Sequence, residues 1–80
     1  MRKPVVLPEL GAANAKLSVW FVSPGDVVYA GDRLVEIMVD GATFDITSPV
    51  TGRFAETCAL PDDLVNPGQT LGIVEEGTIP

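Results

Sequence analysis

The sequence contains an internal repeat with an offset of 37 residues, and this repeat constrains the fold more than any other feature. Adding 37 carries five residues onto identical ones: Pro24, Asp26, Val28, Gly31 and Leu34 onto Pro61, Asp63, Val65, Gly68 and Leu71. A unit this short cannot bury an apolar face alone, because its strands need a second layer to cover them. We therefore expect two copies of one small unit, packed about an approximate twofold axis.

Short runs of β-branched and aromatic residues between Gly, Pro and Asp indicate four strands in each copy. In the first copy they are expected at residues 5–8, Leu17–Val22, Val27–Tyr29 and Leu34–Val39, and the offset places Val5–Leu7 on Ala42–Phe44. We predict an all-β fold, a flattened sandwich (barrel-sandwich hybrid) of two four-stranded antiparallel sheets, in which the two halves of the chain pack as the paired sheets. One detail is irregular, since Leu34 and Ile37 have opposite parity and both should be buried.

Asp40 and Gly41 separate two strand-like runs, Leu34–Val39 and Thr43–Thr47, and predict the tip of a hairpin. Both central residues of a type I′ turn have positive φ, which Gly adopts freely and Asp more easily than most residues. In the repeat, position 41 corresponds to Thr78, so the tip and the chain's two ends are expected at opposite ends of the domain. The domain is expected to occupy residues 1–76, and residues 77–80 are interpreted as the start of a linker or tail.

Composition limits the classes of function. Eighty residues with a formal net charge of −6 form one domain whose thin core leaves little room for an active-site cavity. The cations are dispersed, which argues against nucleic-acid binding, and the apolar runs are far shorter than a membrane span. These cations are Arg2, Lys3, Lys16, Arg33 and Arg53. No basic and apolar signal segment opens the sequence, so a cytoplasmic location is expected.

The sequence offers no His, no pair of Cys and no sheltered pair of carboxylates from which an active site or metal site could be built. It contains no His, and Cys58 is its single Cys, which is expected to be a small apolar residue in a strand rather than a metal ligand or nucleophile. Glu36, Asp40 and Asp45 lie near the predicted tip, but an exposed hairpin lacks the partly dry cleft that raises the pKa of a general acid. Trp20 is expected to fill the core or cover a sheet edge.

The hairpin and its flanks resemble the lipoyl domains, the carrier modules of 2-oxo acid dehydrogenase complexes. That family has a Glu, three intervening residues, Asp-Lys-Ala, then a strand, Ala-Pro, and a Gly three residues after the Pro. The same spacing is kept here by Glu36, Asp40-Gly41-Ala42, Ser48-Pro49 and Gly52, except that Gly41 stands where the family has its lipoyl lysine. Biotin carriers share the eight-residue spacing from lysine to proline but flank the lysine with methionines, so Asp40 and Ala42 favour the lipoyl branch.

This resemblance, which covers residues 4–76, implies a lipoyl-type carrier domain of an acyltransferase component, not an enzyme in itself. It implies the decarboxylase and dihydrolipoamide dehydrogenase components as partners. It also implies that the loop after the first strand lies beside the tip and takes part in partner recognition. The residues of this loop are Leu10, Gly11, Ala12, Ala13 and Asn14.

Lipoate is the cofactor of the resembled family, but none is expected on this chain as written. Lipoylation forms an amide with a lysine amine, which Gly41 lacks, and Lys3 and Lys16 are not expected to replace it. A lipoate-protein ligase would become a partner only if the lysine were restored. The alternatives are a degenerate docking module, a deliberately unmodifiable carrier, a biotin-carrier-like domain, and an adaptor β-sandwich from a transporter or membrane-fusion assembly.

Overall fold

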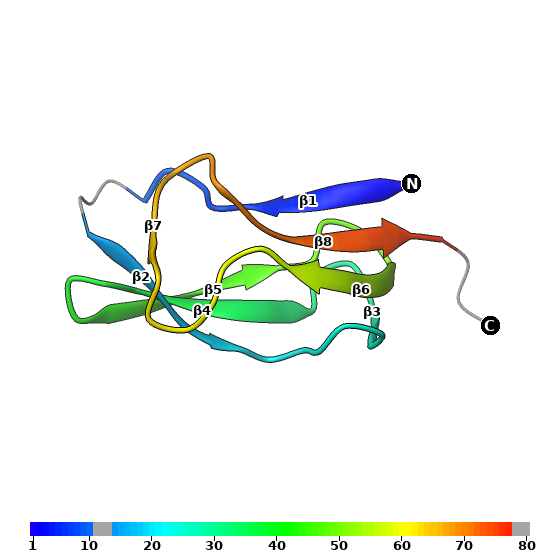
Figure 1. The fold of residues 1–80 in the computed structure, drawn as a ribbon, viewed down its shortest axis with the longest axis horizontal. Helices are drawn as coiled ribbons and strands as arrows, with labels where there is room; N and C mark the ends of the chain where they lie inside the picture. The colour runs from blue at the N-terminus through cyan, green and yellow to red at the C-terminus, as the bar shows by residue number, and fades with distance from the viewer. Residues whose placement is uncertain (11–13, 78–80) are drawn as a thin grey trace.

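The structure, a computed structural model, describes residues 1–10 and 14–77 and shows eight strands in this part of the chain. The strands are β1 (Arg2–Val6), β2 (Ala15–Trp20), β3 (Val27–Val28), β4 (Arg33–Val39), β5 (Ala42–Thr47), β6 (Gly52–Thr57), β7 (Leu64–Val65) and β8 (Thr70–Glu76) (Figure 1). They form two antiparallel four-stranded sheets, β1-β8-β6-β3 and β5-β4-β2-β7, in an elongated body with Cα extents of 40 × 18 × 18 Å. The predicted fold class is therefore confirmed. None of the described residues forms a helix long and apolar enough to cross a membrane.

Each sheet draws two strands from each half of the chain, whereas the sequence led us to expect one half in each sheet. β1 and β3 of the first half join β6 and β8 of the second, and the other sheet combines β2 and β4 with β5 and β7. The reason is that β4 pairs with β2 of its own half on one side and with β5 of the other half on its second side. Hydrogen bonds as well as apolar contacts therefore join the two halves.

The repeat is exact in the last three strands of each half. Adding 37 to the bounds of β2, β3 and β4 gives the bounds of β6, β7 and β8. The register irregularities repeat as well, since the β2–β4 ladder shifts between Leu17 and Val19 and the β6–β8 ladder between Phe54 and Glu56. This β-bulge therefore belongs to the repeat unit and is part of its design rather than a local defect.

The first strands of the two halves follow a different offset, 41 residues, so the predicted match of Val5–Leu7 with Ala42–Phe44 is wrong. The loop after β1 covers residues 7–14, whereas the equivalent loop after β5 covers only residues 48–51. Its four additional residues account for the change of offset. Leu7 and Ser48 are equivalent in space, because the Leu7 N–H donates to the Gln69 carbonyl (3.0 Å) and the Ser48 N–H donates to the Asp32 carbonyl (2.8 Å).

Met1 and Glu76 form the counterpart of the Val39–Ala42 pair that closes the hairpin. The Glu76 N–H donates to the Met1 carbonyl (2.8 Å), and the Met1 amino group donates to the Glu76 carbonyl (3.2 Å). Figure 1 shows the N-terminus and the end of β8 at one end of the molecule and the β4–β5 tip at the other, as predicted. Thr78, which the repeat relates to Gly41, lies outside the described residues.

Two aspartates close equivalent turns before β3 and β7. Asp26 accepts a hydrogen bond from the Ser23 N–H (2.9 Å), and Asp63 accepts one from the Leu60 N–H (2.8 Å). The residue before each aspartate has positive φ, 99° at Gly25 and 74° at Asp62. These carboxylates thus stabilise turns, in the manner of side chains that mimic a backbone acceptor.

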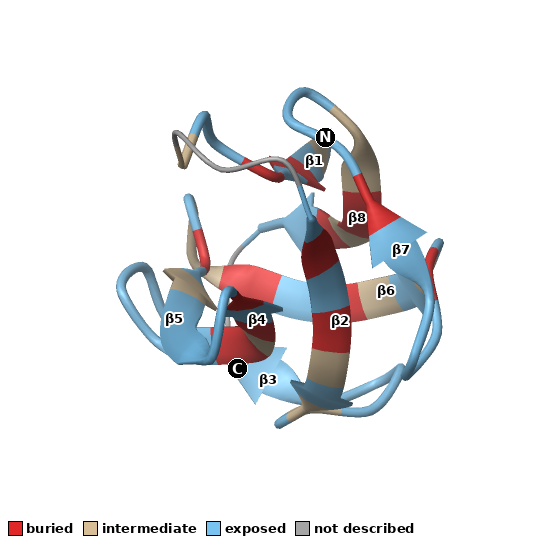
Figure 2. Cartoon of the chain, turned by 90° about the vertical axis from the view of Figure 1, so that its left-hand side faces the viewer, coloured by how far each residue is buried: buried red, intermediate tan, exposed pale blue. Residues whose placement is uncertain are grey.

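The core consists of two apolar clusters, and the repeat relates residues of one cluster to residues of the other. Leu17 and Leu71 belong to one cluster, and their counterparts Phe54 and Leu34 belong to the other. The β4–β5 ladder shifts between Arg33 and Val35, and this bulge explains how Leu34 and Ile37 are both buried despite their opposite parity. Figure 2 shows buried residues along β2 and β4, whereas β5 is mostly exposed.

Trp20 packs against both clusters, as does Ile46, and so helps to join them. Its indole N–H donates to the Ala59 carbonyl (2.9 Å), and its ring lies 5.0 Å from that of Phe54. The predicted packing role is therefore confirmed. The prediction for Cys58 is wrong, because this residue follows the end of β6 and is exposed; its counterpart, Phe21, is also exposed.

Gly52 is required by a close approach of two backbones, and its substitution tests the β6–β8 contact. A Cβ at this position would lie 2.0 Å from the Glu75 carbonyl oxygen. We expect Gly52→Ala to lower the free energy of unfolding by about 3 kcal/mol, since β8 must move away. Gly77→Ala is the matched control, because a Cβ there meets nothing within 4 Å. Guanidinium denaturation followed by Trp20 fluorescence measures both, and equal stabilities would contradict this close contact.

Candidate functional site

The β4–β5 tip has the type I′ geometry that its two residues predict. Asp40 has φ 49° and Gly41 has φ 81°, so both central residues lie in the left-handed region. The last cross-strand pair before the turn is Val39 with Ala42, and Asp40, Gly41 and Ala42 are all exposed. The turn is thus tight, projects from the end of the molecule and leaves its central residues open to a partner.

Gly41 offers no side chain for covalent attachment, although there is space for one. A Cβ at Gly41 would meet no atom within 4 Å. Neither lysine of the sequence lies at the tip, since Lys3 pairs with Val74 in β1 and Lys16 pairs with Met38 in β2. The tip as it stands therefore does not fit a group that is bound as a lysine amide.

Of the carboxylates near the hairpin, Asp45 has a structural contact, whereas Glu36 lies on the outer face of the sheet. Arg33 pairs with Asp45 across β4 and β5 (3.3 Å), and its guanidinium lies 5.1 Å from the centre of the Phe21 ring. Glu36 lies opposite Asp45 in the ladder and points outward between two buried residues. Among the described residues, no three His, Cys, Asp or Glu side chains gather closely enough to hold a metal ion.

Comparison with known proteins assigns this architecture to a family. A model of the biotin and lipoyl attachment family, described as "Biotin-requiring enzyme", matches residues 3–74. The chain belongs to this biotin/lipoyl family. The lipoyl domain of the 2-oxoglutarate dehydrogenase complex from Azotobacter vinelandii has the same fold, with a TM-score of 0.67, 27% identity and 96% of both chains covered.

Two relatives of this chain are much longer proteins. The succinyltransferase component of the 2-oxoglutarate dehydrogenase complex from Bartonella vinsonii subsp. berkhoffii is 34% identical over 79 residues, which are 96% of this chain and 19% of the relative. The lipoamide acyltransferase component of the branched-chain alpha-keto acid dehydrogenase complex from Arabidopsis thaliana is 39% identical over 61 residues, 76% of this chain and 13% of the relative. The chain therefore spans less than a fifth of either relative.

The loop that follows β1 is described only at its two ends in this family member. Leu10 is half-buried and packs against the apolar cluster that contains Leu17 and Leu71, and Asn14 is exposed. Ala15 pairs with Val39, the residue before Asp40, so the loop enters β2 beside the tip. Gly11, Ala12 and Ala13 lie outside the described residues, and the predicted recognition role of the loop stays a prediction.

A groove that the sequence analysis did not predict lies along β6 and β8, away from the hairpin tip. It has a volume of about 440 Å³, and Arg53 and Glu75 are among its lining residues. The Arg53 guanidinium donates to the Gly25 carbonyl (3.2 Å), so it is already engaged in the fold. Gly52 also lines the groove, at the point where its backbone lies against that of Glu75.

The strain at Gly41 can be separated from its lack of contacts by two substitutions. We expect Gly41→Ala to cost about 1 kcal/mol of stability, because an L-residue is held at positive φ although no atom obstructs its Cβ. Gly41→Asn should cost less, since Asn tolerates the left-handed region better. Chemical denaturation measures both; equal losses for the two variants would show that φ does not determine the choice of residue here.

Proposed function

We propose that this chain is a lipoyl-type carrier domain from an acyltransferase component of a 2-oxo acid dehydrogenase complex. The observation that carries the proposal is the exposed hairpin tip of Asp40 and Gly41, in a chain whose relatives are acyltransferase components of such complexes. The domain itself is not an enzyme in this proposal. Its part is to present a hairpin to the enzymes of the complex.

The proposal includes the loss of the attachment residue, since Gly41 takes the place of the lysine. A lipoyl group, where it is attached, supplies a dithiolane that carries acyl groups on a long flexible arm. The residues of this chain would only hold the hairpin in position, with Asp40 and Ala42 as its flanks. No lipoate is proposed on the chain as written, because the tip has no amine with which to form the amide.

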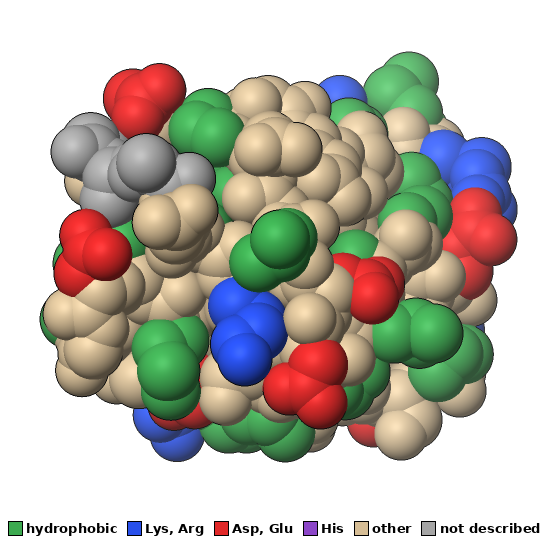
Figure 3. Space-filling view, turned by 60° about the vertical axis from the view of Figure 1, so that its left-hand side comes forward, with side chains coloured by type: hydrophobic (Ala, Val, Ile, Leu, Met, Phe, Trp, Pro, Cys, Tyr) green, Lys and Arg blue, Asp and Glu red, His purple; other side chains and the backbone are tan. Residues whose placement is uncertain are grey.

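The arrangement of the domain agrees with a carrier. The tip lies at the opposite end from Met1 and Glu76, so a chain continuing beyond either residue would leave the tip free (Figure 1). We propose residues 1–76 as the folded domain and residues 77–80 as the start of a linker. Figure 3 shows a convex surface on which hydrophobic side chains alternate with charged ones, without a deep hollow.

The proposed partners are the decarboxylase and dihydrolipoamide dehydrogenase components. The loop formed by residues 10–14 would help in recognition, because its end enters β2 beside the tip. The acidic net charge and the dispersed cations support protein partners over nucleic acid. The cytoplasmic location stays a prediction.

A second function is supported by the same glycine. A domain that kept the fold but lost the lysine would serve as a docking or adaptor module, for which the tip is only a contact surface. The biotin-carrier alternative has less support, because Asp40 and Ala42 are not the methionines that flank a biotinyl lysine.

The absence of a modifiable lysine is tested by intact mass. We expect the protein incubated with lipoate, ATP and a lipoate-protein ligase, or with biotin, ATP and a biotin ligase, to keep its unmodified mass. The Azotobacter vinelandii lipoyl domain is the positive control for the first ligase. A mass increase that maps to Lys3 or Lys16 would show that the attachment site has been placed wrongly.

Restoring the lysine tests whether Gly41 is the one missing part of a carrier. We expect Gly41→Lys to be lipoylated, because the fold, the exposed tip and both flanking residues are in place. The substitution should cost on the order of 1 kcal/mol, since it places a side chain at positive φ unless the turn relaxes. The measurement is intact mass after incubation with the ligase, and circular dichroism establishes that the variant is folded.

The control for this experiment is a lysine placed elsewhere on the hairpin. Thr43→Lys adds an exposed lysine two residues beyond the tip and should remain unmodified. A folded Gly41→Lys protein that is not lipoylated would refute the carrier proposal and favour the docking module.

A further inference from the structure

The outer faces of the two sheets differ at equivalent positions, although the repeat makes their backbones alike. On the sheet β1-β8-β6-β3, Arg2 forms ion pairs with both Glu56 and Glu75. The equivalent positions on the other sheet hold Thr43, Val19 and Met38. The fold does not require apolar side chains at this place, because its own second copy uses a charged cluster there.

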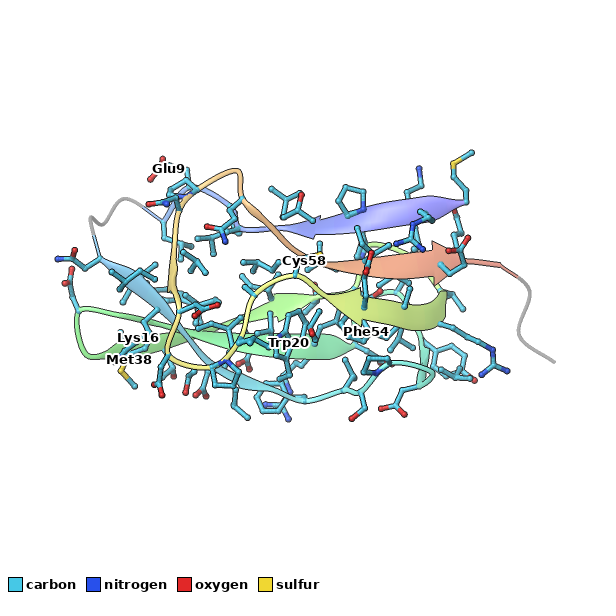
Figure 4. All side chains as sticks on the ribbon, in the orientation of Figure 1. Glu9, Lys16, Trp20, Met38, Phe54 and Cys58 are labelled. Atoms are coloured by element: carbon cyan, nitrogen blue, oxygen red, sulfur yellow. The ribbon has the colours of Figure 1, made fainter. Side chains whose placement is uncertain are left out.

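Four side chains on the outer face of β2 and β4 form a quartet of alternating chemistry: Lys16, Val19, Glu36 and Met38. Met38 lies opposite Lys16 and Glu36 lies opposite Val19 in the ladder. One diagonal of the quartet therefore joins two apolar residues, each 40% exposed, and the other joins a cation and an anion. Figure 4 shows Lys16 and Met38 next to each other at the hairpin half of the molecule.

The two charges of the quartet have no partner within residues 1–10 and 14–77. The ion pairs there involve Arg2, Arg33 and the Met1 amino group, and neither Lys16 nor Glu36 takes part. Arg33, by contrast, is held by Asp45 and Phe21 at the far end of the same face. The quartet thus presents one free positive charge and one free negative charge beside an apolar pair.

We propose that the quartet is the centre of a symmetric contact between two copies of this chain. A twofold interface places the same surface of both copies face to face. With the axis along the diagonal from Met38 to Val19, each apolar side chain meets its own copy. Lys16 of each copy then faces Glu36 of the other, which forms two ion pairs around an apolar centre.

The distribution of charge favours a second copy over another partner. A basic partner would leave Lys16 opposed by a like charge, and an acidic partner would do the same to Glu36, whereas the quartet is complementary to itself. Each copy carries a formal charge of −6, so the copies repel at long range and the contact is weak and transient. This inference does not depend on Gly41 or on the carrier function.

Charge exchange within the quartet tests the contact. Sedimentation equilibrium of the full chain up to about 1 mM should show a weight-average mass that rises toward the dimer. Lys16→Glu or Glu36→Lys alone should weaken association roughly tenfold, because each variant brings like charges together. The double variant Lys16→Glu/Glu36→Lys should regain the association of the unaltered protein, and the two single variants should associate with each other when mixed.

Arg53→Glu is the matched control, because it makes the same change of charge at the position equivalent to Lys16 on the other sheet. It should associate more strongly than Lys16→Glu at the same ionic strength, and circular dichroism should show all variants folded. Three results would overturn the proposal: a monomer at every concentration, equal effects of Lys16→Glu and Arg53→Glu, or a double variant that associates no better than the single ones.

Discussion

Neither half of this chain can cover its own apolar side chains, and the structure depends on ladders that join a strand of one half to a strand of the other. Four of the six ladders are of this kind: β1–β8, β2–β7, β3–β6 and β4–β5. Loss of either half would expose an apolar cluster and also leave strand edges without hydrogen-bond partners. The folding unit is therefore the whole domain, and the short strands β3 and β7 are stable only within it.

The repeat and the turn residues were sufficient to predict the fold class, because they act locally or at one fixed offset. They did not predict which strands share a sheet, since that depends on pairing between distant segments. The relation between β1 and β5 was hidden by the four additional residues in the loop after β1. The burial of both Leu34 and Ile37 looked irregular because simple alternation assumes a strand without bulges. The bulge between Arg33 and Val35 adds one residue, so that side chains on its two sides no longer follow one alternation.

The tip of the candidate site was predicted well, whereas its surroundings were not. Asp40 and Gly41 specify their turn through their own φ preferences, so sequence alone was enough. The contacts of Arg33 with Asp45 and Phe21, and the quartet around Met38, join residues of different segments of the chain, and the alignment of β2 with β4 includes a bulge. Such surfaces become visible only when the register is known. The comparison between the two copies of the repeat then separates residues that the fold needs from residues that it does not.

The hydrogen bonds between Met1 and Glu76 have a topological consequence. Met1 and Glu76 occupy the place that Ala42 and Val39 occupy at the hairpin. The Met1–Glu76 pair and the hairpin tip are therefore equivalent points, related by the approximate twofold axis of the domain. A circular permutant with a short turn joining Glu76 to Met1, and with new termini between Asp40 and Gly41, would keep every strand pair of the present fold. The position of the chain termini thus decides which end of the domain is tethered and which end is presented. The two sheets themselves do not distinguish the two ends.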